Sequence, residues 1–181
     1  MKSFAWGRWA LAIAVAAALA MWPVWLSNPH PEEPHTGEMA QLDFVVKDMD
    51  GRDVRLADFK GRPIILNFWA TWCGPCKAEI PALNELAAKY RDQKLAVLGI
   101  SVDDSPEDLK AFTAEFKIDY PVLIGRDQNR LQEIYDSVLW VPVTWYIRPD
   151  GTVFLKHRGP ASTEWFEEQL KAMLADAAER P

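Results

Sequence analysis

Cysteine is scarce in this chain of 181 residues, and the two cysteines, Cys73 and Cys76, stand three positions apart. With no other cysteine present, the fold cannot depend on a framework of structural disulfides, and a zinc site of four cysteines is excluded. The oxidation state of the protein is therefore a property of this one pair of thiols.

Basic residues are also too few to indicate a nucleic-acid partner. Lys and Arg number 20 against 26 Asp and Glu, which gives a net charge of −6, and a mildly acidic chain without a basic patch argues against binding to nucleic acid. No internal repeat is visible. Because 49% of the residues are hydrophobic, we expect one sizeable core, with no cofactor and no metal, once the N-terminal segment is set aside.

The first 26 residues predict a membrane anchor. Lys2 and Arg8 precede an uncharged stretch, residues 9–26, which as a helix would span about 27 Å, close to the hydrocarbon thickness of a bilayer. Tryptophans lie at both ends of this stretch, as in two interfacial belts. Because the basic residues come first, we expect the rest of the chain outside the cytoplasm, on the periplasmic side of a bacterial inner membrane. The alternative is a cleaved signal peptide, since residues 18–20 fit a small-x-small cleavage site.

Residues 27–40 predict a semi-extended linker, and residues 41–181 a folded domain. The linker holds three prolines and three glutamates and shows no apolar periodicity. We interpret His30 and His35 within it as solvated side chains, because a structural zinc site needs four converging ligands.

The folded domain alternates predicted strands with predicted helices. Two pairs of short strands flank turn signals, Asp50-Gly51 and residues 149–151, and are expected to form hairpins. Pro81 lies within a helical pattern and is expected to kink it. Such an alternation indicates an α/β sandwich with a mixed sheet. The expected strands cover residues 42–46, 54–56, 64–70, 95–102, 122–124, 143–147 and 153–156, and the expected helices cover residues 73–90, 105–116, 131–137 and 163–178.

The two cysteines stand where such a fold places chemistry. They follow the apolar strand 64–70 and begin the next helix, and a C-x-x-C pair in this position is typical of a dithiol redox site. The helix N-terminus stabilises a thiolate there.

Residues 68–77, Phe-Trp-Ala-Thr-Trp-Cys-Gly-Pro-Cys-Lys, resemble the active-site region of thioredoxins. Pro142, followed by Thr144 and a strand, is similar to the cis-proline segment of that superfamily. The anchor, the opening hairpin and residues 67–72 and 76–79 together resemble the TlpA-like and ResA-like membrane-anchored thiol-disulfide oxidoreductases of bacteria. The resemblance covers roughly residues 40–178. It implies a thioredoxin-like three-layer sandwich with an N-terminal β-hairpin and an inserted strand and helix.

This resemblance also implies roles for single residues. Cys73, partly exposed at the helix start, would be the attacking thiolate, and Cys76 would resolve the mixed disulfide. Pro142 would be cis and would leave the backbone of Val141 open to a partner chain. The residues expected at the docking surface are Trp72, Gly74, Pro75 and Val141.

Glu79 is the candidate for proton transfer at this site. Asn67 stands where thioredoxins carry a buried aspartate, and an amide cannot take the proton that leaves Cys76. Glu79 lies three residues beyond Cys76 on nearly the same helix face. We expect it to accept or donate that proton and to raise the cysteine pKa. The alternative is a solvated glutamate.

Two tryptophans lie near the site, and two others depart from the family pattern. Trp69 should pack beside the active-site loop and Trp72 should cover the apolar docking surface, and neither can do acid-base work. Trp140 stands where the family usually has a small residue, and Trp145 where it usually has phenylalanine. These departures concern the shape of the partner groove.

The function expected from the resemblance is reduction of disulfides in target proteins. An integral-membrane thiol donor would supply the electrons, and the targets would include apocytochrome c and copper-site proteins. One alternative is a thiol peroxidase of the peroxiredoxin type, although the residues just before Cys73 lack the peroxidase proline, and Thr71 stands two positions before Cys73 instead of three. Another is a redox-inert adaptor. The motif alone leaves the direction of electron flow open.

Overall fold

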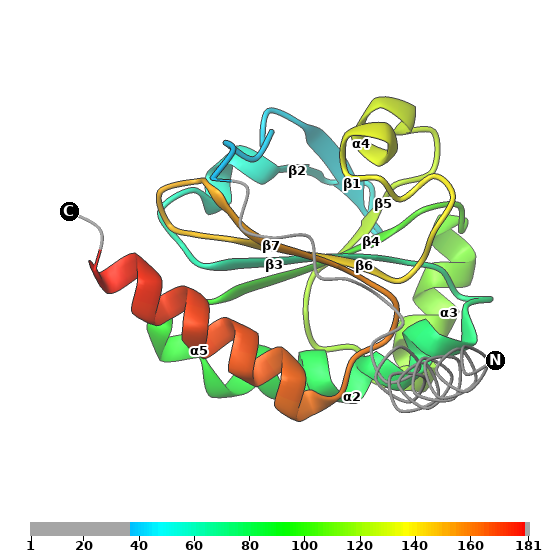
Figure 1. The fold of residues 1–181 in the computed structure, drawn as a ribbon. Helices are drawn as coiled ribbons and strands as arrows, with labels where there is room; N and C mark the ends of the chain where they lie inside the picture. Colours follow the sequence, from blue (N-terminus) through cyan, green and yellow to red (C-terminus); the bar gives the residue numbers. More distant parts are fainter. Residues whose placement is uncertain (1–36, 180–181) are drawn as a thin grey trace, which may run out of the picture. The chain divides into compact units, whose positions relative to one another are not determined.

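In the computed structural model, which describes residues 37–179, seven strands form one mixed sheet in the order β2-β1-β5-β4-β3-β6-β7 (Figure 1). The central strands β3, β4 and β5 are parallel, and the strands at both sides of them are antiparallel. The mixed sheet expected from the sequence is therefore confirmed. The strands are β1 (Val45–Asp48), β2 (Asp53–Arg55), β3 (Ile64–Trp69), β4 (Ala96–Ser101), β5 (Val122–Ile124), β6 (Val143–Ile147) and β7 (Val153–Arg158).

Helices cover both faces of the sheet and complete the three layers. In Figure 1, α2 (Gly74–Lys89) and α5 (Thr163–Glu179) lie on one side and α4 (Asn129–Ile134) on the other. The helix α3 (Pro106–Phe116) lies on the α2 side, where the ammonium of Lys77 stands 5.6 Å from the ring centres of Phe112 and Phe116. Two short 3-10 helices are also present. One, Leu56–Phe59, follows β2, and the other, Arg91–Gln93, follows α2.

The strand β3 is buried on both faces because its side chains alternate between two helical layers. Trp69 packs toward α3, with its ring 5.2 Å from that of Phe112. Phe68 points to the other face and stacks on Tyr135 at 5.4 Å. The chain therefore leaves the carboxyl end of β3 between the two helical layers, and α2 begins there.

The edges of several elements differ from the sequence-based expectation by two or three residues. Strand β1 starts at Val45 instead of residue 42, and α4 covers Asn129–Ile134 instead of residues 131–137. Both hairpin glycines have a positive φ, +80° at Gly51 and +89° at Gly151, as their turns require. The helix α2 continues past Pro81 to Lys89.

The predicted anchor and most of the predicted linker fall outside the described residues, so both remain predictions. Within the described part, no helix has the length and apolar character needed to cross a bilayer. The last linker residues already pair with the β6–β7 hairpin: the amide of Ala40 donates to the carbonyl of Gly151, and the amide of Val153 donates to that of Glu38.

Candidate active site

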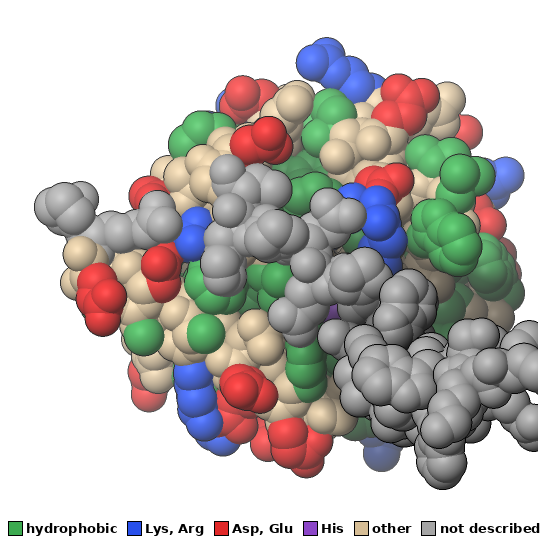
Figure 2. All heavy atoms as spheres, viewed as in Figure 1, with side chains coloured by type: hydrophobic (Ala, Val, Ile, Leu, Met, Phe, Trp, Pro, Cys, Tyr) green, Lys and Arg blue, Asp and Glu red, His purple; other side chains and the backbone are tan. Residues whose placement is uncertain are grey.

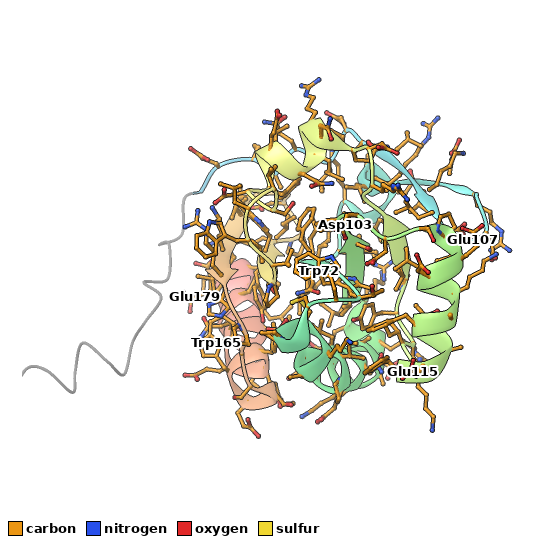
Figure 3. All side chains as sticks on the ribbon, turned by 90° about the vertical axis from the view of Figure 1, so that its right-hand side faces the viewer. Trp72, Asp103, Glu107, Glu115, Trp165 and Glu179 are labelled. Carbon is orange, nitrogen blue, oxygen red and sulfur yellow. A yellow bond between two sulfur atoms is a disulfide. The ribbon has the colours of Figure 1, made fainter. Side chains whose placement is uncertain are left out.

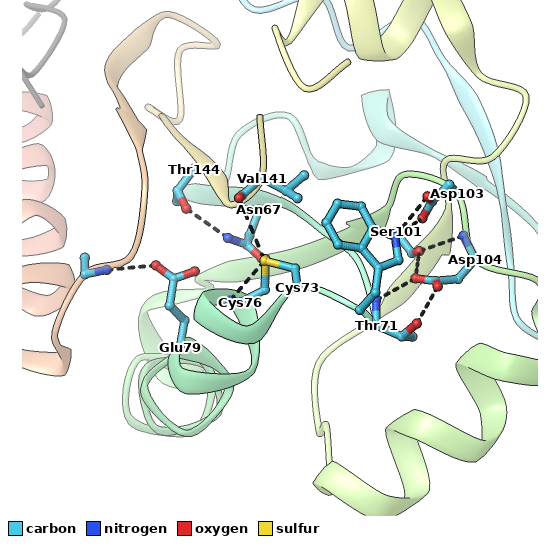
Figure 4. The surroundings of a disulfide bond; sticks show 12 residues. Asn67, Thr71, Cys73, Cys76, Glu79, Ser101, Asp103, Asp104, Val141 and Thr144 are labelled. Carbon is cyan, nitrogen blue, oxygen red and sulfur yellow. Dashed lines mark hydrogen bonds between the residues drawn. A yellow bond between two sulfur atoms is a disulfide. The ribbon is translucent and has the colours of Figure 1, made fainter. Parts of the chain in front are cut away.

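Cys73 and Cys76 form a disulfide at the N-terminus of α2 (Figure 4). Cys73 is the N-cap residue: its Sγ accepts the amide of Cys76 at 3.2 Å, and its carbonyl accepts the amide of Lys77. Gly74 and Pro75 fill the loop between the cysteines and face solvent. The sulfur of Cys73 therefore lies at the positive end of the helix dipole, which favours its thiolate once the disulfide opens.

Cys73 is more buried than expected. It is 4% exposed and Cys76 is 3% exposed, so the expectation of a partly exposed Cys73 is wrong. The reason is the segment that packs on it, because the carbonyl oxygen of Val141 lies 3.8 Å from its Sγ. The Val141–Pro142 peptide bond is cis, as the resemblance implied.

Glu79 is buried in the core beside the disulfide. Its side chain is on the buried face of α2 and the residue is 1% exposed, so the alternative of a solvated glutamate is wrong. One oxygen, Oε1, accepts the amide of Ala161 at 2.9 Å, and Oε2 has no hydrogen-bond partner among the described residues. Burial raises the pKa of Glu79 to about 8, although the amide of Ala161 and the side chain of Asn67 oppose the rise.

Among the described residues, none of the groups that shift the pKa of Glu79 carries a positive charge. Asn67 is buried and its Nδ2 donates to Oγ1 of Thr144 at 2.9 Å. Burial raises the pKa of Tyr120 and of Tyr146, and the negative charge of Glu79 raises both further. A carboxyl surrounded by an amide and two neutral phenols keeps its proton at neutral pH.

Two acidic residues of the loop after β4 hold the residues that precede Cys73, and the sequence analysis missed both. The carboxylate of Asp104, 8% exposed, accepts the amide of Thr71 at 2.8 Å, the hydroxyl of Thr71 at 2.5 Å and the hydroxyl of Ser101 at 2.6 Å. Asp103 accepts the indole N–H of Trp72 at 2.9 Å. The signal was available, because β3 and β4 are adjacent parallel strands whose carboxyl ends meet at one sheet edge.

The tryptophans near the site divide into a packed one and exposed ones. Trp69 is 2% exposed and packs beside the active-site loop, as expected. Its indole N–H has no partner among the described residues and lies above Gly99, where an added Cβ would come within 2.8 Å of it. Trp72 is 64% exposed and Trp140 is 63% exposed. The docking roles proposed for Trp72, Gly74, Pro75 and Val141 remain predictions, although all four surround the disulfide.

Within residues 37–179, no group of three or more His, Cys, Asp or Glu side chains is placed to hold a metal ion. What the geometry does supply is a dithiol/disulfide couple at a helix N-terminus and a buried carboxyl that can carry a proton.

Comparison with known proteins agrees with this chemistry. The model of the AhpC/TSA family matches residues 36–155. The thiol-disulfide oxidoreductase ResA of Bacillus thuringiensis subsp. konkukian is 34% identical over 129 residues, which cover 71% of this chain and 73% of that protein. ResA of Geobacillus thermodenitrificans is also 34% identical, over 131 residues that cover 72% of this chain and 74% of that protein.

Solved structures share the fold. A putative thiol:disulfide interchange protein DsbE from Chlorobium tepidum superimposes with a TM-score of 0.70 at 30% identity, over 78% of this chain and 99% of that one. A secreted disulfide oxidoreductase of Mycobacterium tuberculosis, at 24% identity and a TM-score of 0.65 over 72% and 96%, shows the fold alone. The chain therefore belongs to the thioredoxin-like AhpC/TSA family and, within it, to the ResA-like thiol-disulfide oxidoreductases.

Proposed function

We propose that this oxidoreductase works as a disulfide reductase on the extracytoplasmic side of a bacterial inner membrane, tethered by its N-terminal residues. An integral-membrane thiol donor supplies its electrons, and its targets are oxidised proteins such as apocytochrome c or copper-site proteins. The observation that carries the thiol-disulfide exchange is the buried Glu79 carboxyl beside the Cys73–Cys76 disulfide, and the reducing direction follows the likeness of the Cys-Gly-Pro-Cys motif to thioredoxin. The apolar stretch 9–26 behind two basic residues supports the tether.

The reaction proceeds through two thiol-disulfide exchanges. The Cys73 thiolate attacks one sulfur of the target disulfide, so that a mixed disulfide forms and the other target sulfur leaves as a thiolate. The Cys76 thiol then loses its proton and attacks the Sγ of Cys73. The second target thiolate leaves, two electrons have passed to the target, and the Cys73–Cys76 disulfide has formed.

Glu79 takes the proton that Cys76 releases. In the reduced protein Glu79 has given up its proton, and its carboxylate accepts the proton of Cys76 because burial favours the neutral acid. With the disulfide formed, its pKa is about 8 and it holds the proton. When the membrane donor reduces the disulfide again, the protonated Glu79 returns the proton to the departing Cys76 thiolate. The free Oε2 atom is the group available for this transfer.

The direction of electron flow is tested by the reduction potential of the Cys73–Cys76 couple, equilibrated in thiol redox buffers. A value near the ~−270 mV of thioredoxin supports a reductase, whereas one near the ~−120 mV of DsbA makes the protein a disulfide donor and contradicts the proposal. Dithiol-driven reduction of insulin supports the proposal too, and its absence would support the redox-inert adaptor. Consumption of a hydroperoxide faster than reduction of insulin would support the peroxidase.

The location and the targets need the full chain in cells. We expect the protein to stay with membranes after an alkaline wash and to be accessible to protease from the periplasmic side. A mature N-terminus at Met21, with release from membranes, would contradict the tether. Trapping with a Cys76→Ser variant, which stalls the mixed disulfide, should capture apocytochrome c or copper-site proteins and identify the targets.

A further inference from the structure

The surface beside the disulfide exposes large apolar side chains. Trp72, Val138, Leu139 and Trp140 are 64%, 57%, 81% and 63% exposed, and the other large exposed hydrophobic residues of the described part, Met39 and Val45, do not line this surface. Figure 2 shows hydrophobic side chains gathered where the chain runs from α4 to β6. The four residues line a groove of about 270 Å³ together with Val102, Asp103, Gln132, Ser137 and Val141. A contiguous apolar surface of this kind marks an interaction site.

Three of these side chains, those of Val138, Leu139 and Trp140, belong to residues 137–141, a segment that is fixed at both ends. Asp136 has a positive φ of 52°, and its carboxylate forms ion pairs with Lys156 at 2.7 Å and with Arg158. At the other end, the amide of Gly159 donates to the carbonyl of Pro142 at 2.9 Å. The apolar side chains are therefore presented on a backbone that is already ordered, which lowers the entropy cost of binding a partner.

The groove also carries one charge. Among the described residues that line it, Asp103 is the only charged one. Its carboxylate already accepts the indole N–H of Trp72, a neutral donor that leaves the negative charge uncompensated (Figure 3). A partner chain with a lysine or arginine here gains an ion pair, and one with an acidic residue is repelled.

We propose that this groove binds an extended substrate segment in which a large apolar side chain neighbours the cysteine and a lysine or arginine lies close by. The apolar side chain packs against Leu139 and Trp140, and the basic group faces Asp103. The inference rests on the thiol-disulfide activity and applies to either direction of electron flow.

The test uses four short peptides whose single cysteine is a mixed disulfide with thionitrobenzoate. Each peptide carries either Trp or Ala next to the cysteine, and either Lys or Glu two residues from the cysteine. The pre-reduced full chain attacks each peptide in a stopped-flow cell, and released thionitrobenzoate is followed by absorbance. We expect the Trp/Lys peptide to react fastest, with a loss of about tenfold for Trp→Ala. Lys→Glu should cost about fivefold at low salt, and added salt should reduce that loss.

Variants assign the preference to the groove. Leu139→Ala and Trp140→Ala should remove most of the preference for Trp, and Asp103→Asn should remove the preference for Lys over Glu. Each peptide rate is divided by the rate of the same variant with the small disulfide DTNB, which corrects for changes at the cysteines. Val45→Ala, an exposed apolar residue outside the groove, is the matched control and should behave as wild type.

Three results would overturn the proposal. The first is that all four peptides react within twofold of each other, and the second is that every variant keeps the same preference. The third is a dimer of the protein alone that Leu139→Ala dissociates, since a second copy would then be the occupant. Absence of thionitrobenzoate release from all peptides would refute the thiol-disulfide activity along with the proposal, so the two failures are distinguishable.

Discussion

Replacing Glu79 by glutamine should change how the stability of the oxidised protein depends on pH. The pKa of the carboxyl is 4.5 as a reference and about 8 in the fold, because burial disfavours its charge. Between these two values the unfolded chain has released the proton and the folded chain has kept it. The free energy of unfolding therefore falls by about 1.4 kcal/mol per pH unit over this window, or about 5 kcal/mol in all. Glutamine does not titrate, so the variant lacks this loss.

The assay is urea unfolding of the disulfide form at several pH values from 5 to 9, followed by tryptophan fluorescence. Other titrating groups contribute equally to both proteins, so the difference in unfolding free energy between Glu79→Gln and wild type isolates the effect. We expect this difference to grow in favour of the variant as the pH rises to 8. The control is Glu85→Gln, an exposed residue on the same helix. A constant difference across the window would refute a buried neutral acid at Glu79.

Three other variants test the packing around the site. Asp104→Asn leaves a donor of the active-site loop without its acceptor and should lower the free energy of unfolding, measured in urea, by about 1–3 kcal/mol. Unchanged stability would show that the loop does not depend on this hydrogen bond. Gly99→Ala places a Cβ 2.8 Å from the indole nitrogen of Trp69, so it should lower the free energy of unfolding by about 1–3 kcal/mol and alter the tryptophan emission. Unchanged emission would mean that the Trp69 side chain did not move. Tyr135→Phe loses the hydrogen bond to the carbonyl of Gln41 and should cost about 1 kcal/mol, and a stabilised variant would contradict that bond.

The elements that form the site could be predicted because their signals are local. The apolar run that becomes β3 is long enough to be buried on both faces. The two cysteines and Pro75 then begin a helix, with Cys73 as its N-cap. Ser105 caps α3 in the same way, through its side chain and the amide of Asp108. In each case the residues that decide the structure are neighbours in the sequence.

Burial and long-range contacts at the site could not be predicted because their partners are distant in the sequence. The amide that binds Glu79 belongs to Ala161, 82 residues away. Cys73 is covered by Val141 across 68 positions. A glutamate on a helix is exposed in most proteins, and contacts with residues distant in the sequence, such as Ala161, make this one an exception.

Two buried carboxyl groups near the disulfide therefore differ in what surrounds them, and this difference matches the roles proposed for them. Asp104 accepts three hydrogen bonds, two of them from Thr71, and so fixes the loop that ends at Cys73. Glu79 accepts one hydrogen bond and keeps one oxygen free. A fully paired carboxylate holds geometry, because moving it breaks several bonds at once. A half-paired one in an apolar setting readily binds a proton, and thiol-disulfide exchange at Cys76 needs both properties.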